Sequence, residues 1–134
     1  MATASVPALN GELVGVLVVD DQLVFREAAR ELVEAVPEFV LLDTAGSGEQ
    51  ALALADELKP DLVLVDVWMD GMDGVATAAR LHAVHPATVV VLISVEEQCD
   101  LPTGAGSSGA ATMVRKQDLS PTALKRLWTV YGNQ

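Results

Sequence analysis

The chain has 134 residues, of which 51% are hydrophobic and 4% aromatic, and its formal net charge is −11. This length predicts one domain whose core is built mainly from Val, Leu and Ala. The negative charge argues against nonspecific binding to nucleic acid or anionic lipid, since both depend on Lys and Arg. The one cysteine permits no internal disulfide, and no apolar run approaches the roughly 18 residues of a membrane span. We therefore expect a cytoplasmic protein.

After a small-residue leader at residues 1–10, apolar runs alternate with helical patterns, and we expect residues 11–134 to form one domain. Short Val- and Leu-rich runs are typical of strands buried on both faces of a parallel sheet. Such strands are expected at residues 14–19, 39–44, 62–67, 88–94 and 111–115. Helical spacing of apolar residues predicts helices at residues 22–36, 49–58 and 74–82, and a last helix that begins at Ser120 and Pro121.

One segment departs from this alternation. The sequence "EEQCDLPTGAGSSGA", between the fourth and fifth strands, stands where a helix is expected. Each Gly disfavours a helix by about 1 kcal/mol and an interior Pro by about 3 kcal/mol. The segment therefore predicts a short or irregular fourth helix.

Strands that alternate with helices predict an α/β fold with a doubly wound parallel sheet and right-handed crossovers. In such sheets, ligands bind beyond the carboxyl ends of the strands, where the winding reverses. Polar residues at those ends are therefore the candidates for a functional site. They are Asp20, Asp21, Asp66, Ser94 and Lys116.

The adjacent carboxylates of Asp20 and Asp21 repel each other unless they cap a helix or hold a cation, and taken alone they are consistent with both. Together with Asp66 they form a set of hard oxygen ligands that suits Mg²⁺. An aspartate beside such an ion is a competent nucleophile toward phosphorus, and a lysine and a hydroxyl can stabilise the transferred group. The set predicts transfer of a phosphoryl group onto a carboxylate.

Four motifs, in this order, resemble the receiver domain of two-component response regulators: "VLVVDD", "LVLVDVWMDGMDG", "VVVLIS" and "MVRK". The resemblance covers nearly the whole chain after Asn10. The first helix is most similar to receivers that often carry a helix-turn-helix output domain. The resemblance implies a flavodoxin-like sheet of five strands in the order 2-1-3-4-5, with helices on both faces.

The resemblance also implies roles for the residues at the strand ends. Asp66 is expected to be the phosphoacceptor, Ser94 the switch hydroxyl, and Lys116 the lysine that contacts the phosphoryl oxygens. Asp20 is expected to act on the metal largely through water. The implied Mg²⁺ ligands are Asp20, Asp21, Asp66 and the backbone carbonyl of Trp68.

The implied function is that of a stand-alone signalling domain that catalyses only its own phosphorylation and dephosphorylation, and so is not an enzyme. Its expected partners are a histidine kinase or phosphotransfer protein and a downstream protein target. A homodimer is left open, and no direct contact of this chain with nucleic acid or membrane is expected. Phosphorylation would remodel the protein through its added charge.

Other interpretations remain beside this one. Asp70, Val95 and Met113 depart from the pattern of the family at the places of a usual Pro, small residue and switching aromatic. These departures favour a pseudo-receiver, an interaction module that works without phosphorylation. A phosphohydrolase would need a D-x-D motif in the first strand. "GSGEQA" follows the wrong strand for a dinucleotide site, and "GAGSSG" lacks the Lys-Ser/Thr of a P-loop.

Overall fold

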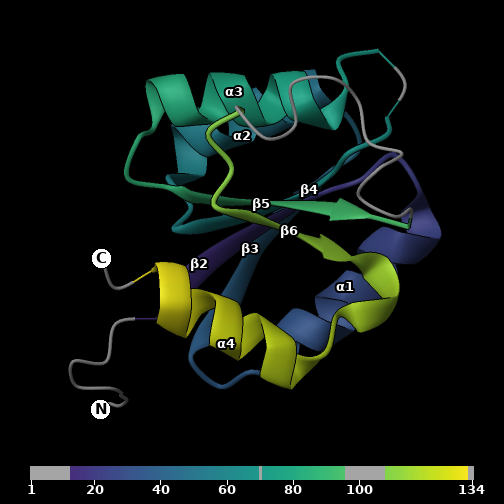
Figure 1. The fold of residues 1–134 in the computed structure, drawn as a ribbon, viewed down its shortest axis with the longest axis vertical. Helices are drawn as coiled ribbons and strands as arrows, with labels where there is room; N and C mark the ends of the chain where they lie inside the picture. Colours follow the sequence, from purple (N-terminus) through teal and green to yellow (C-terminus); the bar gives the residue numbers. More distant parts are fainter. Residues whose placement is uncertain (1–12, 70, 96–107, 133–134) are drawn as a thin grey trace.

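Five parallel strands form one sheet in the computed structural model, which describes residues 13–69, 71–95 and 108–132. The order across the sheet is β3-β2-β4-β5-β6, and every neighbouring pair is parallel (Figure 1). This is the order 2-1-3-4-5 of a flavodoxin-like doubly wound sheet, which confirms the predicted fold class. The strands are β2 (Val14–Val19), β3 (Phe39–Ala45), β4 (Leu62–Asp66), β5 (Val89–Ser94) and β6 (Thr112–Arg115).

Four α-helices and a 3₁₀ turn accompany these strands in the described ranges. Helices α1 and α4 cover one face of the sheet, and α2 and α3 cover the other (Figure 1). The helices are α1 (Leu23–Glu34), α2 (Gly48–Leu58), α3 (Gly74–Val84) and α4 (Pro121–Tyr131), and the 3₁₀ turn is η3 (Lys116–Asp118).

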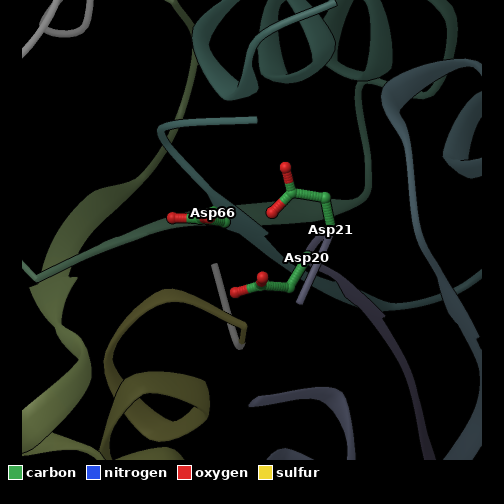
Figure 2. A group of neighbouring side chains, drawn as sticks. All are labelled: Asp20, Asp21 and Asp66. Atoms are coloured by element: carbon green, nitrogen blue, oxygen red, sulfur yellow. The ribbon is translucent and has the colours of Figure 1, made fainter. Parts of the chain in front are cut away.

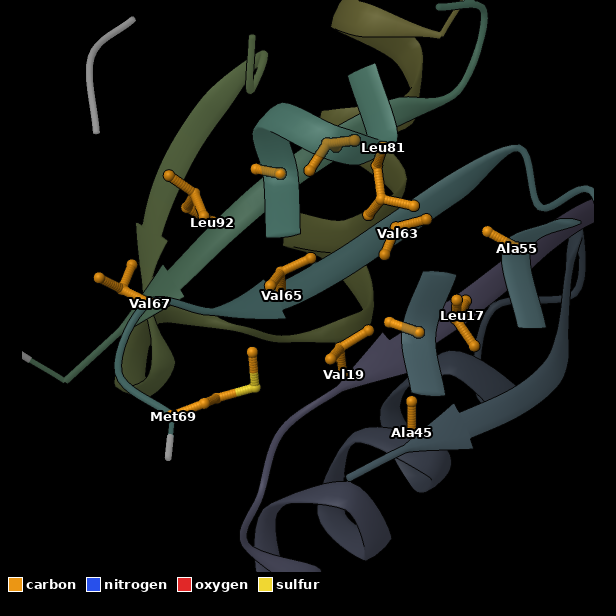
Figure 3. Packing of buried hydrophobic residues seen from close by; sticks show 13 residues of the cluster. Leu17, Val19, Ala45, Ala55, Val63, Val65, Val67, Met69, Leu81 and Leu92 are labelled. Atoms are coloured by element: carbon orange, nitrogen blue, oxygen red, sulfur yellow. The ribbon is translucent and has the colours of Figure 1, made fainter. Parts of the chain in front are cut away.

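The core consists of two layers, one on each face, because side chains along a strand alternate between the faces. In β2, Leu17 and Val19 pack toward α2 and α3, whereas Val16 and Val18 pack toward α1 and α4. Figure 3 shows the first of these layers, in which Ala45 and Ala55 lie among larger Val and Leu side chains. The buried central strands thus hold their carboxyl ends at one rigid edge.

Local signals set most helix ends. The hydroxyl of Ser120 accepts a hydrogen bond from the N–H of Ala123 at 3.0 Å, and Pro121 is the first residue of α4, as predicted. Helix α1 ends at Glu34 rather than at the expected Val36, because Pro37 disfavours the helical conformation in the residue before it. None of the helices in the described part of the chain has the length and apolar character that crossing a membrane requires.

Some of the sequence-based expectations concern residues outside the described ranges. The leader at residues 1–10, Asp70, and most of the segment expected to form an irregular helix belong to this group. The described end of that segment includes Gly109, whose φ of 92° lies in the region that favours glycine.

Candidate functional site

Three carboxylates meet at the carboxyl ends of β2 and β4. Asp20 and Asp21 directly follow β2, and Asp66 is the last residue of β4, the strand next to β2 in the sheet. One oxygen from each carboxylate lies within 4.8 Å of the others (Figure 2). The side chains differ in environment, since Asp20 is fully buried and Asp66 is 7% exposed, whereas Asp21 is exposed to solvent.

Two hydrogen bonds hold Asp20 in place, one to its side chain and one to its backbone carbonyl. Its Oδ1 accepts a hydrogen bond from the backbone N–H of Gln22 at 2.8 Å, and its backbone carbonyl accepts one from Nη1 of Arg26 at 2.7 Å. Helix α1 has Gln22 as its N-cap, without a side-chain capping bond. Asp20 therefore stabilises the turn before α1 instead of capping the helix, which leaves its second oxygen available.

That second oxygen, Oδ2 of Asp20, is buried and has no hydrogen-bond donor of good geometry within the described residues. Its compensation is chiefly ionic, because Nζ of Lys116 lies 2.7 Å away. The same ammonium is 3.8 Å from Oδ2 of Asp66. The side chain of Lys116 is only 13% exposed and extends from the first residue of η3, directly after β6. One lysine thus bridges two of the three carboxylates.

The electrostatics of the site disfavour full ionisation of Asp66. Burial, followed by repulsion from Asp20, raises the pKa of Asp66, and the charge of Lys116 and a backbone hydrogen bond from Trp68 lower it. The raising effects prevail and bring the pKa of Asp66 to about 6. Among the described residues, Lys116 pairs with two of the three acids, and the guanidinium of Arg26 contacts the backbone of Asp20 and not its carboxylate. The carboxylates are therefore only partly compensated, and a divalent cation would supply the missing positive charge.

The other sequence-predicted residues lie around this cluster. Ser94 ends β5 and is buried, one residue beyond Ile93, the residue of β5 that pairs with Asp66. Trp68 and Val95 are 45% and 60% exposed, so two large apolar side chains near these strand ends face solvent. Met113, at the place of the usual aromatic, is partly buried and packs against the core layer under α2 and α3.

Sequence reasoning missed Phe25, Arg26 and Gly74. The first two lie on α1 and reach the site only because α1 packs beside β2, so the chain offers no direct signal for them. Gly74, in contrast, stands in the glycine-containing motif "MDGMDG", so the sequence did mark this position. A Cβ atom on Gly74 would lie 2.0 Å from the backbone carbonyl oxygen of Asp66, a distance that no packing tolerates. The absence of a side chain at Gly74 lets α3 begin directly against the end of β4.

Replacement of Gly74 with alanine is expected to lower the free energy of unfolding by about 2 to 3 kcal/mol, since backbone must move to accept the new methyl group. The matched control is Gly71→Ala in the same loop. Among the described residues beyond its immediate chain neighbours, no atom lies within 4 Å of a Cβ at Gly71, so its φ of 75° is what opposes alanine, at a cost of about 1 kcal/mol. Urea denaturation of both variants checks this. Equal losses would contradict the close contact of Gly74 with β4.

The fold and the acidic edge together define a doubly wound domain with three clustered carboxylates and one lysine at its strand ends. Residues 16–127 match the response regulator receiver domain family. The chain belongs to this family of two-component signalling proteins, which confirms the resemblance seen in the sequence motifs.

Individual relatives agree with this assignment. The signal receiver domain of the response regulator NarL from Mycobacterium tuberculosis has a TM-score of 0.81 and 31% identity, over 92% of this chain and 99% of that one. Response regulator GacA of Pseudomonas viridiflava is 36% identical over 78% of this chain, and the nitrate/nitrite response regulator NarL of Escherichia coli is 31% identical over 86%. The chain spans about half the length of these two curated relatives, 49% and 53% respectively.

Proposed function

We propose that this receiver domain accepts a phosphoryl group on Asp66 from a histidine kinase or phosphotransfer protein, and signals through protein contacts. The observation that carries the proposal is the convergence of three carboxylates, with ligand oxygens within 4.8 Å of one another, on a lysine that bridges two of them. Family membership supports it, since two-component signalling requires an acceptor at this edge of the sheet.

The residues present fit a resident Mg²⁺. The donors are hard carboxylate oxygens within 4.8 Å of one another. In addition, the described residues give the buried Oδ2 of Asp20 an ion pair with Lys116 but no hydrogen bond of good geometry. We assign Asp20, Asp21, Asp66 and the backbone carbonyl of Trp68 to the metal, with Asp20 acting largely through water. When bound, Mg²⁺ would neutralise charge on the carboxylates and on the incoming phosphoryl oxygens.

In the transfer step, a carboxylate oxygen of Asp66 forms a bond to phosphorus while the bond from phosphorus to the donor nitrogen breaks. The electron pair of that bond stays with the donor imidazole. Lys116, which already lies 3.8 Å from Asp66, would neutralise charge on the phosphoryl oxygens. Ser94, at the end of the neighbouring strand, would donate a hydrogen bond to them. The added charge of about −1.5 to −2 would then reorganise the ends of β5 and β6.

The test is phosphorylation of the intact chain by acetyl phosphate with Mg²⁺, followed by intact-mass spectrometry and phosphate-affinity electrophoresis. We expect one phosphoryl group on the wild-type chain and none on Asp66→Asn. The control variant is Asp43→Asn, whose exposed carboxylate on β3 accepts a local hydrogen bond from the N–H of Thr44. An adduct that survives Asp66→Asn, or no adduct on the wild-type chain, would refute the assignment.

A pseudo-receiver is the second candidate, and the position of Met113 favours it. Because this side chain packs into the core and is not aromatic, no Tyr or Phe rotamer at this position can report the state of Ser94. Such a module would use the same fold for constitutive protein contacts. The labelling experiment separates the two functions, because a pseudo-receiver acquires no phosphoryl group on Asp66.

A further inference from the structure

An aromatic ring lies against the ammonium group at the centre of the site. Phe25, the third residue of α1, places its ring centroid 4.3 Å from Nζ of Lys116. This distance is within the range at which a cation is attracted to the face of an aromatic ring. No role for Phe25 follows from the carboxylate cluster itself, and the contact joins two residues 91 positions apart in the sequence.

The ring completes a three-sided environment for the ammonium. Two sides are the carboxylates of Asp20, at 2.7 Å, and Asp66, at 3.8 Å. The third is the face of Phe25, and together they leave the side chain of Lys116 only 13% exposed. A lysine in water is hydrated and samples many rotamers. Here the ring replaces part of that hydration and restricts where the charge can go.

The ring is itself held firmly. Phe25 is half-buried and packs against the core layer between the sheet and α1 and α4. Arg26, the next residue, is tied to the backbone carbonyl of Asp20 at 2.7 Å, which keeps the first turn of α1 close to the end of β2. The position of the ring relative to the carboxylates is therefore set by the fold.

We propose that Phe25 is a positioning residue for Lys116. Its ring holds the ammonium beside both carboxylates, so that Lys116 can move from Asp20 to a phosphoryl group on Asp66 without first leaving the pocket for water. The effect of the ring on phosphoryl transfer would pass through the lysine. This inference rests on the proposed phosphorylation of Asp66.

The alternative is that Phe25 serves only as an apolar core residue, and ring electrostatics distinguish the two roles. Stepwise fluorination of a phenylalanine ring weakens its attraction for cations while the ring keeps its shape and apolar character. The chain offers a matched control, because its two phenylalanines are Phe25 and Phe39. Phe39 is 7% exposed and packs in the same core layer as Phe25.

The experiment introduces mono-, di- and trifluorophenylalanine at either position and measures the rate of phosphorylation by acetyl phosphate with Mg²⁺. At position 25 we expect the rate to fall with each fluorine, by roughly threefold to tenfold over the series. At position 39 we expect no trend. Phe25→Leu should slow phosphorylation by a similar factor. Phe25→Tyr, which keeps an aromatic face, should be phosphorylated at close to the wild-type rate.

A second measurement, by NMR, detects the contact between Phe25 and Lys116 without phosphorylation. Protons above a ring face resonate upfield, so the ε-methylene protons of Lys116 should shift downfield in Phe25→Leu and keep their wild-type shift in Phe39→Leu. A wild-type chain that is phosphorylated without any fluorine trend at position 25 would overturn the role of Phe25 alone. A wild-type chain that is not phosphorylated would overturn the proposed function, and this inference with it.

Discussion

Replacement of Lys116 with methionine is expected to lower the free energy of unfolding of the metal-free protein by about 3 to 4 kcal/mol at neutral pH. Asp20 is fully buried, and its Oδ2 depends on the ammonium of Lys116 at 2.7 Å. Removal of one partner of a buried ion pair leaves the other charge uncompensated, which is the costly case. Methionine is an unbranched apolar side chain of similar length, so the loss of stability reflects the missing charge more than lost packing.

Urea denaturation with and without Mg²⁺ measures this effect. Added Mg²⁺ should restore most of the lost stability, because a cation on the carboxylates takes over the compensation. Lys125→Met is the matched control, since Nζ of Lys125 lies 2.8 Å from Oε2 of Glu38 in an exposed pair. Exposed pairs contribute only about 0 to 1 kcal/mol. If the two variants lose the same stability, Lys116 does not compensate a buried charge.

The stability of the metal-free protein is expected to fall as the pH rises from about 4 to about 6. Asp66 has a pKa of about 6 in the fold and an ordinary value of 3.8, so the folded state binds more protons than the unfolded state between these values. Stability decreases with pH wherever the folded state holds the extra proton. The difference between the two pKa values corresponds to about 3 kcal/mol at neutral pH.

Asp66→Asn isolates this contribution, because asparagine does not titrate. We expect the variant to be more stable than the wild-type chain above pH 6 by up to about 3 kcal/mol, with the difference vanishing near pH 4. Urea denaturation across this range, in the presence of a chelator, gives both curves. Parallel curves would show that Asp66 titrates with an ordinary pKa and that the carboxylates do not repel one another.

These two predictions describe one property of the site. Its resting state holds acidic groups closer together than their charges favour, with Lys116 as partial compensation. In sites of this kind, the arrangement that favours reactivity lowers the stability of the fold. A bound cation would lower this repulsion, and the relief of repulsion would then contribute to the affinity for the metal. Under the proposed function, the lysine that compensates the carboxylates would also lie close enough to contact a phosphoryl group on Asp66.

Much of the fold was evident from the sequence. The Val- and Leu-rich runs predicted all five strands, and helical spacing with capping residues such as Ser120 predicted the helices of the described ranges, with ends shifted by a few residues. These signals succeed because burial on both faces and local hydrogen bonds depend on neighbouring residues. The strand order followed from resemblance to a family, because no local pattern specifies which strands become neighbours.

The candidate site also has a part that the sequence predicted and a part that only the structure shows. The sequence by itself determined that Asp20, Asp21 and Asp66 belong to one edge, because parallel strands end at a common edge and each carboxylate directly follows an apolar run. Only the tertiary structure decided that Lys116 bridges Asp20 and Asp66, that the ring of Phe25 lies against it, and that Gly74 contacts the end of β4. Those contacts, and the raised pKa of Asp66, depend on how helices and loops pack on the sheet, which is a property of distances between residues far apart in the chain.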